Sequence, residues 1–536
     1  MSKSNCKDRK ETAVNEGGKP NQSNRKNGRN RNRPNYRQGN KPTPASEVHR
    51  DTHGDNDIAW YAKNPQILKD AASVQFFTPA GSGLRLSNSS PDYVTVPGIY
   101  SIEYVPTIGR AMDWTDPANI MCRTVYDFVR SKNSGSKNYD ATHLGFYILG
   151  ADSVLTMWAY MVRIYSCLNY VNGLSRYTGN ALLRAMNVNA ADLRANQARA
   201  RSFINNYAAR ASIMCIPANL PYYARHMWMC TNIYKDSPDA KAQLYFYKPR
   251  ILYKYNTGTV EEGASLTPVS VSPASPYTML TWSNIESTAN SILESMINQE
   301  DFMVISGDIL KAYGSENMFR FAAMPEDRVI EPVYNSEVLQ QIHNATICGV
   351  NPDDDQLFRL KITQNTQVSP DAGNIMYQPI LQTAESVTPN PDVNLDHSML
   401  DLYGVEASPE NVMEATRLKL WATTYSMEAG NGVIPQYYGT EILTRAAIWK
   451  TSIVNGVESS FSSTLSTCSG TGVNSSFLED SLQFDMAPLF IRYAGGTPYR
   501  ILGELDNYTT IDSMVIKRCH EAAILSMFNI PMDVNI

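Results

Sequence analysis

The amino-acid sequence predicts a mainly α-helical protein that carries an inserted α+β domain. Apolar residues recur at helical spacing in the first and last parts of the chain, behind helix-capping residues such as Asp116 and Asp512. In the middle of the chain this periodicity fades, while Pro, Thr, Ser and Tyr become frequent. The first 50 residues have no apolar period at all. We therefore expect four parts: a disordered arm (1–50), a helical part (51–215), a mixed part (216–425) and a second helical part (426–536).

Residues 1–50 form a basic arm. They contain 13 lysines and arginines against 4 acidic residues, a net charge of +9, whereas the other 486 residues carry a net charge of −14. The arm has too little apolar surface to offset its chain entropy. Arginine forks match phosphate geometry, so we expect sequence-independent, salt-sensitive binding to nucleic acid, with a solubilising tail or a localisation signal as alternatives. The candidate nucleic-acid-binding residues are Arg25, Lys26, Arg29, Arg31, Arg33, Arg37 and Lys41.

The first ordered elements after the arm are extended pieces and a helix. Residues 94–108 are interrupted by Pro97 and Pro106, which predicts short strands. Asp116 followed by Pro117 is the signature of a helix start, and apolar residues continue at helical spacing as far as Val129.

Residues 141–174 are unusually apolar. From Leu144 to Val162 only Asp152 carries a charge, so the segment is either a membrane span or a helix buried on nearly all sides. An aspartate at mid-bilayer costs about 2.5–3.5 kcal/mol, which favours the buried helix. We expect a break at Gly150, a cap at Asp152 or Ser153, and a helix from Val154 to Tyr170 that Asn172-Gly173 ends.

An arginine-rich segment follows. Residues 173–225 contain seven arginines, no lysine and one acidic residue, and residues 190–214 read as one long helix. Arg194 and Arg201 are seven residues apart, which places them on one face. Two alternatives stay open for these arginines: a surface that faces anions or another subunit, or ordinary ion pairs with acids from elsewhere in the chain.

The middle part predicts strands and loops with few helices. Residues 243–256 alternate like a strand that Pro249 interrupts, and residues 257–277 read as a loop. A capping box at Ser283–Glu286 predicts a helix to Asn298. Residues 356–364 read as another strand, followed by an extended Pro-rich segment.

Helices are predicted again near the end of the chain. Ser408-Pro409 begins one that spans Val412 to Met427, and residues 440–453 form another. Residues 459–476 read as a Ser/Thr/Gly loop. The last helix begins at Asp512 and ends near Phe528.

Catalytic and metal-binding motifs are not found. The sequence contains no G-x-x-x-x-G-K-[ST], G-x-G-x-x-G, H-E-x-x-H or G-x-S-x-G pattern. His226 lies near Cys230 and could pair with it, although a packed core histidine is the simpler interpretation. The eight cysteines form no C-x-x-C pair, as expected of free thiols. We therefore predict no catalytic residues, no metal site and no cofactor.

Four long segments resemble the capsid proteins of picobirnaviruses, with most likeness to the human type. They carry no catalytic motif, and their length makes the resemblance specific. It extends over about residues 55–536, whereas the arm resembles the family only in its basic composition. The segments are Asp57–Leu84, Val96–Trp114, Arg123–Gly135 and Leu144–Asn187.

The resemblance implies a virion protein, assembled in the host cytoplasm, that forms small icosahedral (T=1) shells of symmetric dimers around segmented double-stranded RNA. It also implies a largely helical shell domain (51–215 and 426–536) and a protruding domain at the dimer interface (216–425), not a jelly roll. Some members of the family cleave off their own arm and disturb membranes, but no self-cleavage residues can be matched in this sequence.

Three functions remain as alternatives. The first is a self-assembling capsid protein whose arm contacts the genome. The second is a non-capsid nucleoprotein that coats RNA, which would form salt-sensitive filaments without closed shells. The third is an enzyme such as a replicase or a self-cleaving hydrolase, which the missing motifs disfavour.

Overall fold

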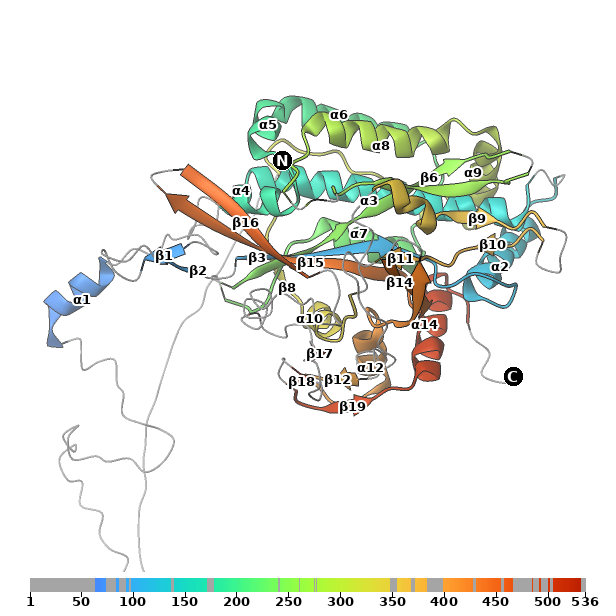
Figure 1. Cartoon of the computed structure of the whole chain (residues 1–536). Helices are drawn as coiled ribbons and strands as arrows, with labels where there is room; N and C mark the ends of the chain where they lie inside the picture. The colour runs from blue at the N-terminus through green and yellow to red at the C-terminus, as the bar shows by residue number, and fades with distance from the viewer. Residues whose placement is uncertain are drawn as a thin grey trace, which may run out of the picture. The chain divides into compact units, whose positions relative to one another are not determined.

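The computed structural model divides the chain into two compact units, residues 1–75 and 76–536. In the first unit, the described residues form helix α1 (Pro65–Ala72). The second unit holds the remaining elements drawn in Figure 1. The structure describes residues 63–73, 83–85, 93–95, 98–135, 139–170, 178–239, 242–259, 261–273, 275, 277–347, 354–367, 372–382, 399–427, 430–454, 457–465, 484, 491–492, 500–501 and 505–531.

Helix α3 (Ala141–Leu168) is the centre of the second unit. Its N-cap is Asp140, whose carboxylate accepts a hydrogen bond from the backbone nitrogen of His143 at 2.9 Å. The expected break at Gly150 and cap at Asp152 or Ser153 are therefore wrong, because the helix runs through all three. Gly150 is tolerated there since Met296 packs directly against its Cα. The helix ends at Leu168, and Asn172-Gly173 lies outside the described residues.

The same chain covers α3 on all sides. Every residue from Leu144 to Leu168 except Trp158 is buried. Elements of the same chain provide this cover, so no other subunit is needed for it. No helix in the described part of the chain combines the length and apolarity needed to cross a membrane. The helices packed on α3 are α2 (Pro117–Ser131), α4 (Thr178–Ala185), α5 (Ala190–Ala195), α6 (Gln197–Ala211), α7 (Pro221–Thr231), α8 (Trp282–Ile297) and α9 (Glu300–Tyr313) (Figure 1).

Two predicted helix starts are confirmed. Helix α2 begins at Pro117 behind Asp116, although the Asp116 carboxylate accepts bonds from the preceding backbone nitrogens of Met112 and Asp113. Helix α14 (Ser513–Met527) begins behind Asp512, which accepts a bond from the backbone nitrogen of Met514 at 2.7 Å.

Two other helix predictions need correction. The expected long helix at 190–214 is divided into α5 and α6, because Asn196 ends the first and begins the second. The capping box of α8 consists of Thr281 and Asn284, two residues earlier than expected. The carboxylate of Glu286 instead accepts hydrogen bonds from the indole nitrogen of Trp282, at 2.7 Å, and from the guanidinium group of Arg199.

A six-stranded mixed sheet joins distant parts of the chain. Strand β3 pairs in parallel with β5 and antiparallel with β15, so the start, middle and end of the chain share one sheet. The predicted helix at 440–453 is wrong because these residues form β15, and β16 occupies the start of the expected loop at 459–476. The sheet order is β16 (Val457–Leu465), β15 (Glu441–Val454), β3 (Ile99–Pro106), β5 (Leu244–Pro249), β4 (Tyr234–Lys235) and β8 (Val333–Tyr334).

Pro249 separates two strands, as predicted. Beyond it, β6 (Ile251–Asn256) enters a second sheet of order β10-β9-β7-β6, which contains β10 (Ile375–Met376), β9 (Ile362–Gln364) and β7 (Ser265–Ser270). Residues 257–277 are thus not entirely a loop, because they contain β7. The strand expected at 356–364 begins as the 3-10 helix η3 (Asp354–Leu360) and becomes β9 only at Ile362.

The helix expected at 412–427 is also shorter than predicted. Helix α12 (Pro409–Thr416) begins behind the predicted cap, Ser408, and is followed by strand β13 (Trp421–Met427). This strand lies in a sheet of order β11-β14-β13, with β14 (Gly430–Tyr437) and β11 (Leu381–Gln382). The remaining elements are α10 (Ser336–His343), η2 (Ser315–Asn317) and the pairs β1 (Gly83–Arg85) with β2 (Tyr93–Thr95), β12 (Met399–Asp401) with β19 (Tyr508–Thr510), and β17 (Ile491–Arg492) with β18 (Arg500–Ile501).

The close packing around α3 predicts a large effect of one methyl group. A Cβ on Gly145 would collide with Cys122, a short side chain on α2, so Gly145→Ala should lower the free energy of unfolding by about 1–3 kcal/mol. The matched control is Gly150→Ala, where the obstacle is the flexible end of Met296 and the change should be about 1 kcal/mol or less. Urea titration measures both. Equal effects of the two variants would contradict this account of the core.

Candidate functional site

The predicted nucleic-acid-binding residues lie outside the described residues. Arg25, Lys26, Arg29, Arg31, Arg33, Arg37 and Lys41 all belong to the first 50 positions, for which the structure describes no residue. Their role therefore stays a prediction. The candidate sites that the structure does describe are the arginine-rich segment and a buried polar cluster beside α3.

Most described arginines of the arginine-rich segment have acidic partners from distant elements. Arg210 lies 2.9 Å from Glu294 of α8, and Arg225 lies 3.0 Å from Glu441 of β15. Arg199 forms a short ion pair with Glu286 of α8. These contacts support the ion-pair alternative for these three side chains. Sequence reasoning could not find the partners, because they lie more than 80 positions away along the chain.

Arg194 and Arg201 line one depression, as their spacing predicts. The depression has a volume of about 600 Å³, and Tyr165, Asn205 and Glu326 also line it. Arg201 donates to the backbone oxygen of Met324 at 3.2 Å and lies 3.5 Å from the exposed carboxylate of Glu326. Arg194 is exposed and forms no ion pair with the described residues. The anion-facing alternative thus stays open for Arg194.

Asp152 of α3 and His226 of α7 form a buried ion pair. The Oδ2 atom of Asp152 lies 2.7 Å from Nδ1 of His226, and both side chains are almost fully buried. The other ring nitrogen, Nε2, faces the backbone oxygen of Thr440 at 3.3 Å and Oε1 of Glu441 at 3.5 Å. Burial opposes the charge on His226, but the two carboxylates outweigh it and raise the pKa of His226 to about 9. Asp152 therefore neutralises a histidine cation instead of capping a helix.

Glu441 connects this pair to two arginines. Its Oε1 atom lies 3.0 Å from Nε of Arg225 and 3.8 Å from a guanidinium nitrogen of Arg417, and the hydroxyl of Thr440 donates to it at 2.6 Å. Burial alone would raise the pKa of Glu441, but Arg225, His226 and Arg417 hold it well below its usual range. The cluster thus ties α3 and α7 to the start of β15 and to the end of α12.

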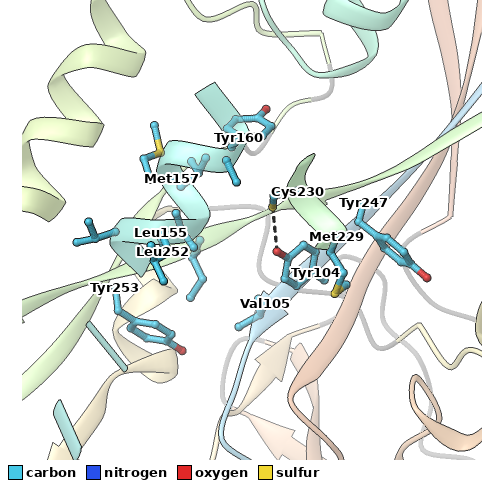
Figure 2. Packing of buried hydrophobic residues seen from close by; sticks show 14 of the residues in the cluster. Tyr104, Val105, Leu155, Met157, Tyr160, Met229, Cys230, Tyr247, Leu252 and Tyr253 are labelled. Atoms are coloured by element: carbon cyan, nitrogen blue, oxygen red, sulfur yellow. Dashed lines mark hydrogen bonds between the residues drawn. The ribbon is translucent and has the colours of Figure 1, made fainter. Parts of the chain in front are cut away.

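The geometry of this cluster is that of a structural network. Among the described residues, His226 has no hydroxyl or thiol nucleophile within hydrogen-bond distance, and its side chain is fully buried. The Cys–His pair does not form, because the thiol of Cys230 bonds to the hydroxyl of Tyr104 at 3.1 Å (Figure 2). Burial raises the pKa of Cys230 to about 11, which keeps the thiol unreactive.

The described cysteines are free thiols, as expected from their spacing: Cys122, Cys167, Cys215, Cys230 and Cys519. In the part of the chain that the structure describes, no group of three or more His, Cys, Asp or Glu side chains could hold a metal ion.

The charge on His226 predicts that alkaline pH destabilises the folded chain. Its pKa rises from 6.5 to about 9 on folding. The stabilisation is therefore complete below pH 6.5 and is lost as the pH rises through 9, a change of about 3 kcal/mol. Between pH 6.5 and 9.5, the free energy of unfolding should fall more steeply in the wild type than in His226→Gln, as measured by urea titration.

The matched control is His520→Gln. Burial lowers the pKa of His520 to about 4, so this histidine is neutral throughout the pH range of the experiment. Above about pH 7.5 this histidine is neutral in the unfolded chain as well, so its substitution should change stability by the same amount at every higher pH. If the His226→Gln and wild-type curves ran parallel instead, His226 would not carry the predicted charge.

The chain is similar in sequence to known capsid proteins. The family model described as "Picobirnavirus, Capsid protein" matches residues 60–467. The capsid protein precursor of Human picobirnavirus (strain Human/Thailand/Hy005102/-) is 29% identical over 510 residues, which cover 89% of this chain and 91% of that protein.

A solved structure has the same fold. The X-ray crystallographic structure of the picobirnavirus capsid superposes with a TM-score of 0.73 at 21% identity, over 89% of this chain and 99% of the other. This similarity confirms the mainly helical fold class with its several sheets. Together with the family match over most of the sequence, it confirms the resemblance seen in the sequence: the chain belongs to the picobirnavirus capsid protein family.

Proposed function

We propose that this capsid protein assembles as symmetric dimers into a small icosahedral shell around double-stranded RNA, with its basic arm in contact with the genome. The observation that carries this proposal is the charge division of the chain: an arm of net charge +9 precedes an acidic body with a capsid fold. An arm of 50 residues reaches roughly 40 Å as a random coil, which is enough to enter a packed genome. Many arms on one shell would bind RNA far more tightly than one arm alone.

The dimer contacts are proposed to lie in residues 216–425, and the shell contacts in residues 51–215 and 426–536. Helices α8 and α9 of the middle segment pack on α3, so their inner faces are not free to meet another subunit. This favours the later part of the segment for the dimer interface. Large apolar side chains are exposed there, including Tyr334 at 43% and Phe358 at 63%. Exposed aromatic residues of this kind are enriched at protein–protein interfaces.

Deleting residues 1–45 should leave assembly intact and reduce packaging. The arm supplies the phosphate contacts, whereas the packed body supplies the contacts between subunits. We expect closed particles by electron microscopy that protect less RNA, or different RNA, from nuclease. The matched control is a full-length arm in which the seven candidate residues are replaced by glutamine, and it should show the same packaging loss.

Loss of all particles in both arm variants would contradict this division of labour. Salt-sensitive filaments without closed shells, formed by the full-length protein, would instead support an RNA-coating nucleoprotein.

Phe358→Ser and Tyr334→Ser should each weaken the dimer. Removing an aromatic anchor from an interface typically costs about 2 kcal/mol or more, which corresponds to a roughly 30-fold rise in the dissociation constant. Analytical ultracentrifugation of unassembled protein measures this constant. Tyr508→Ser is the control, since Tyr508 is equally exposed but belongs to the proposed shell part. Unchanged dimerisation in both test variants would place the interface elsewhere.

A further inference from the structure

Three neighbouring strands place a glutamate between two cations in the interior of the main sheet. The parallel register of β3 and β5 pairs Glu103 with Lys248, and the antiparallel register of β15 and β3 pairs Arg445 with Glu103. The Nζ atom of Lys248 lies 2.8 Å from Oε1 of Glu103, and Arg445 forms a short ion pair with the same oxygen. Lys248 and Glu103 are only 1% and 2% exposed. A lysine buried this deeply is rare and needs a compensating partner.

Asn187 approaches the same lysine from the helical side. It follows α4, which packs on β3 and β15, and it is fully buried. Its backbone has a left-handed conformation with φ of 61°, held by hydrogen bonds to Arg184 and from Leu280. Its side-chain nitrogen donates to the backbone oxygen of Thr278 at 3.1 Å, and its Oδ1 atom lies 2.6 Å from Nζ of Lys248. The carboxamide is therefore fixed against the amine.

The amine, the carboxamide and the carboxylate thus meet in a site that excludes water. Burial lowers the pKa of Lys248 to about 8, even though Glu103 opposes this shift. This shift makes the amine easier to deprotonate than that of an exposed lysine, and the neutral amine is the nucleophile. Burial would raise the pKa of Glu103, but Lys248 and Arg445 outweigh it and lower it to about 2. The carboxylate is therefore ionised, and as a weak base it holds a proton only in passing between the two nitrogens.

We propose that Lys248 and Asn187 form an intramolecular amide cross-link in the folded chain, with Glu103 as the group that relays protons. The Nζ atom of Lys248 gives a proton to Glu103 and attacks Cγ of Asn187, which forms the Nζ–Cγ bond and a tetrahedral intermediate. The Cγ–Nδ2 bond then breaks. In total two protons pass from Nζ to Nδ2 by way of Glu103, and the nitrogen leaves as an ammonium ion.

The reaction is balanced without any further reactant. A lysine ammonium group and an asparagine carboxamide become a secondary amide and an ammonium ion, no electrons are exchanged, and Glu103 ends ionised as it began. Because the bond forms once per chain, a slow reaction suffices, and the fixed contact supplies a high effective concentration. The product ties the end of α4 to β5 and closes a loop of residues 187–248, which restricts the unfolded chain as a disulfide would.

Mass spectrometry of the folded, purified full-length protein tests the cross-link. The denatured chain should be lighter than its sequence by the mass of one ammonia molecule. Trypsin should release a branched peptide that joins residues 185–194 to residues 242–250. Trypsin does not cut the Lys248-Pro249 bond, so the same two segments appear as separate linear peptides when the cross-link is absent. A succinimide at Asn187 also loses ammonia but leaves linear peptides, so the branched peptide is the decisive signal.

Three variants test the roles of Lys248, Asn187 and Glu103 in the cross-link. Lys248→Arg keeps a cation beside Glu103 and should have full mass. Asn187→Asp should still cross-link, now with loss of one water molecule. Glu103→Gln should have full mass while circular dichroism shows a folded chain, and a folded Glu103→Gln protein that still contained the branched peptide would overturn the role of Glu103. Full mass and only linear peptides from the folded wild-type protein would overturn the cross-link itself, whether or not the variants fold.

Discussion

The ion pair between Asp152 and His226 is the constraint on which the rest of the structure depends. Helix α3 is buried almost from end to end by other elements of the same chain. A carboxylate in the middle of such a helix is strongly destabilising unless a partner neutralises it. His226 provides that partner at 2.7 Å, and Glu441 and its two arginines extend the network to β15 and α12. The packing of the central helix thereby determines where α7 and the C-terminal strands lie.

Short capping signals in the sequence predicted three helix starts correctly. Asp116, Ser408 and Asp512 each precede the helix that was expected after them. The prediction was wrong where the spacing of apolar residues is compatible with both a helix and a buried strand. Residues 440–453 have apolar side chains at helical spacing, yet Ala446 to Trp449 are all buried, because the strand they form is covered on both faces. These residues form a strand because they pair with β3, and the local sequence does not encode that pairing.

The candidate sites show the same limit. The shared depression of Arg194 and Arg201 followed from their spacing, because helix geometry is local. The acidic partners of Arg199, Arg210 and Arg225 could not be predicted, since α8 and β15 meet these arginines only in the folded chain. Asp152 was misread as a cap for the same reason: its partner lies 74 residues away. Lys248 and Asn187, 61 residues apart, gave no signal in the sequence at all.

A double-mutant cycle on Asp152 and His226 tests the central claim most directly. The free energies of unfolding of the wild type, Asp152→Asn, His226→Gln and the double variant give the interaction energy of the pair, free of the separate effects of each substitution. If the buried pair holds α3 and α7 together, each single variant should be strongly destabilised and the coupling should be about 2–3 kcal/mol in favour of the pair. A coupling near zero would show that the two side chains contribute independently and that this pair does not hold α3 and α7 together.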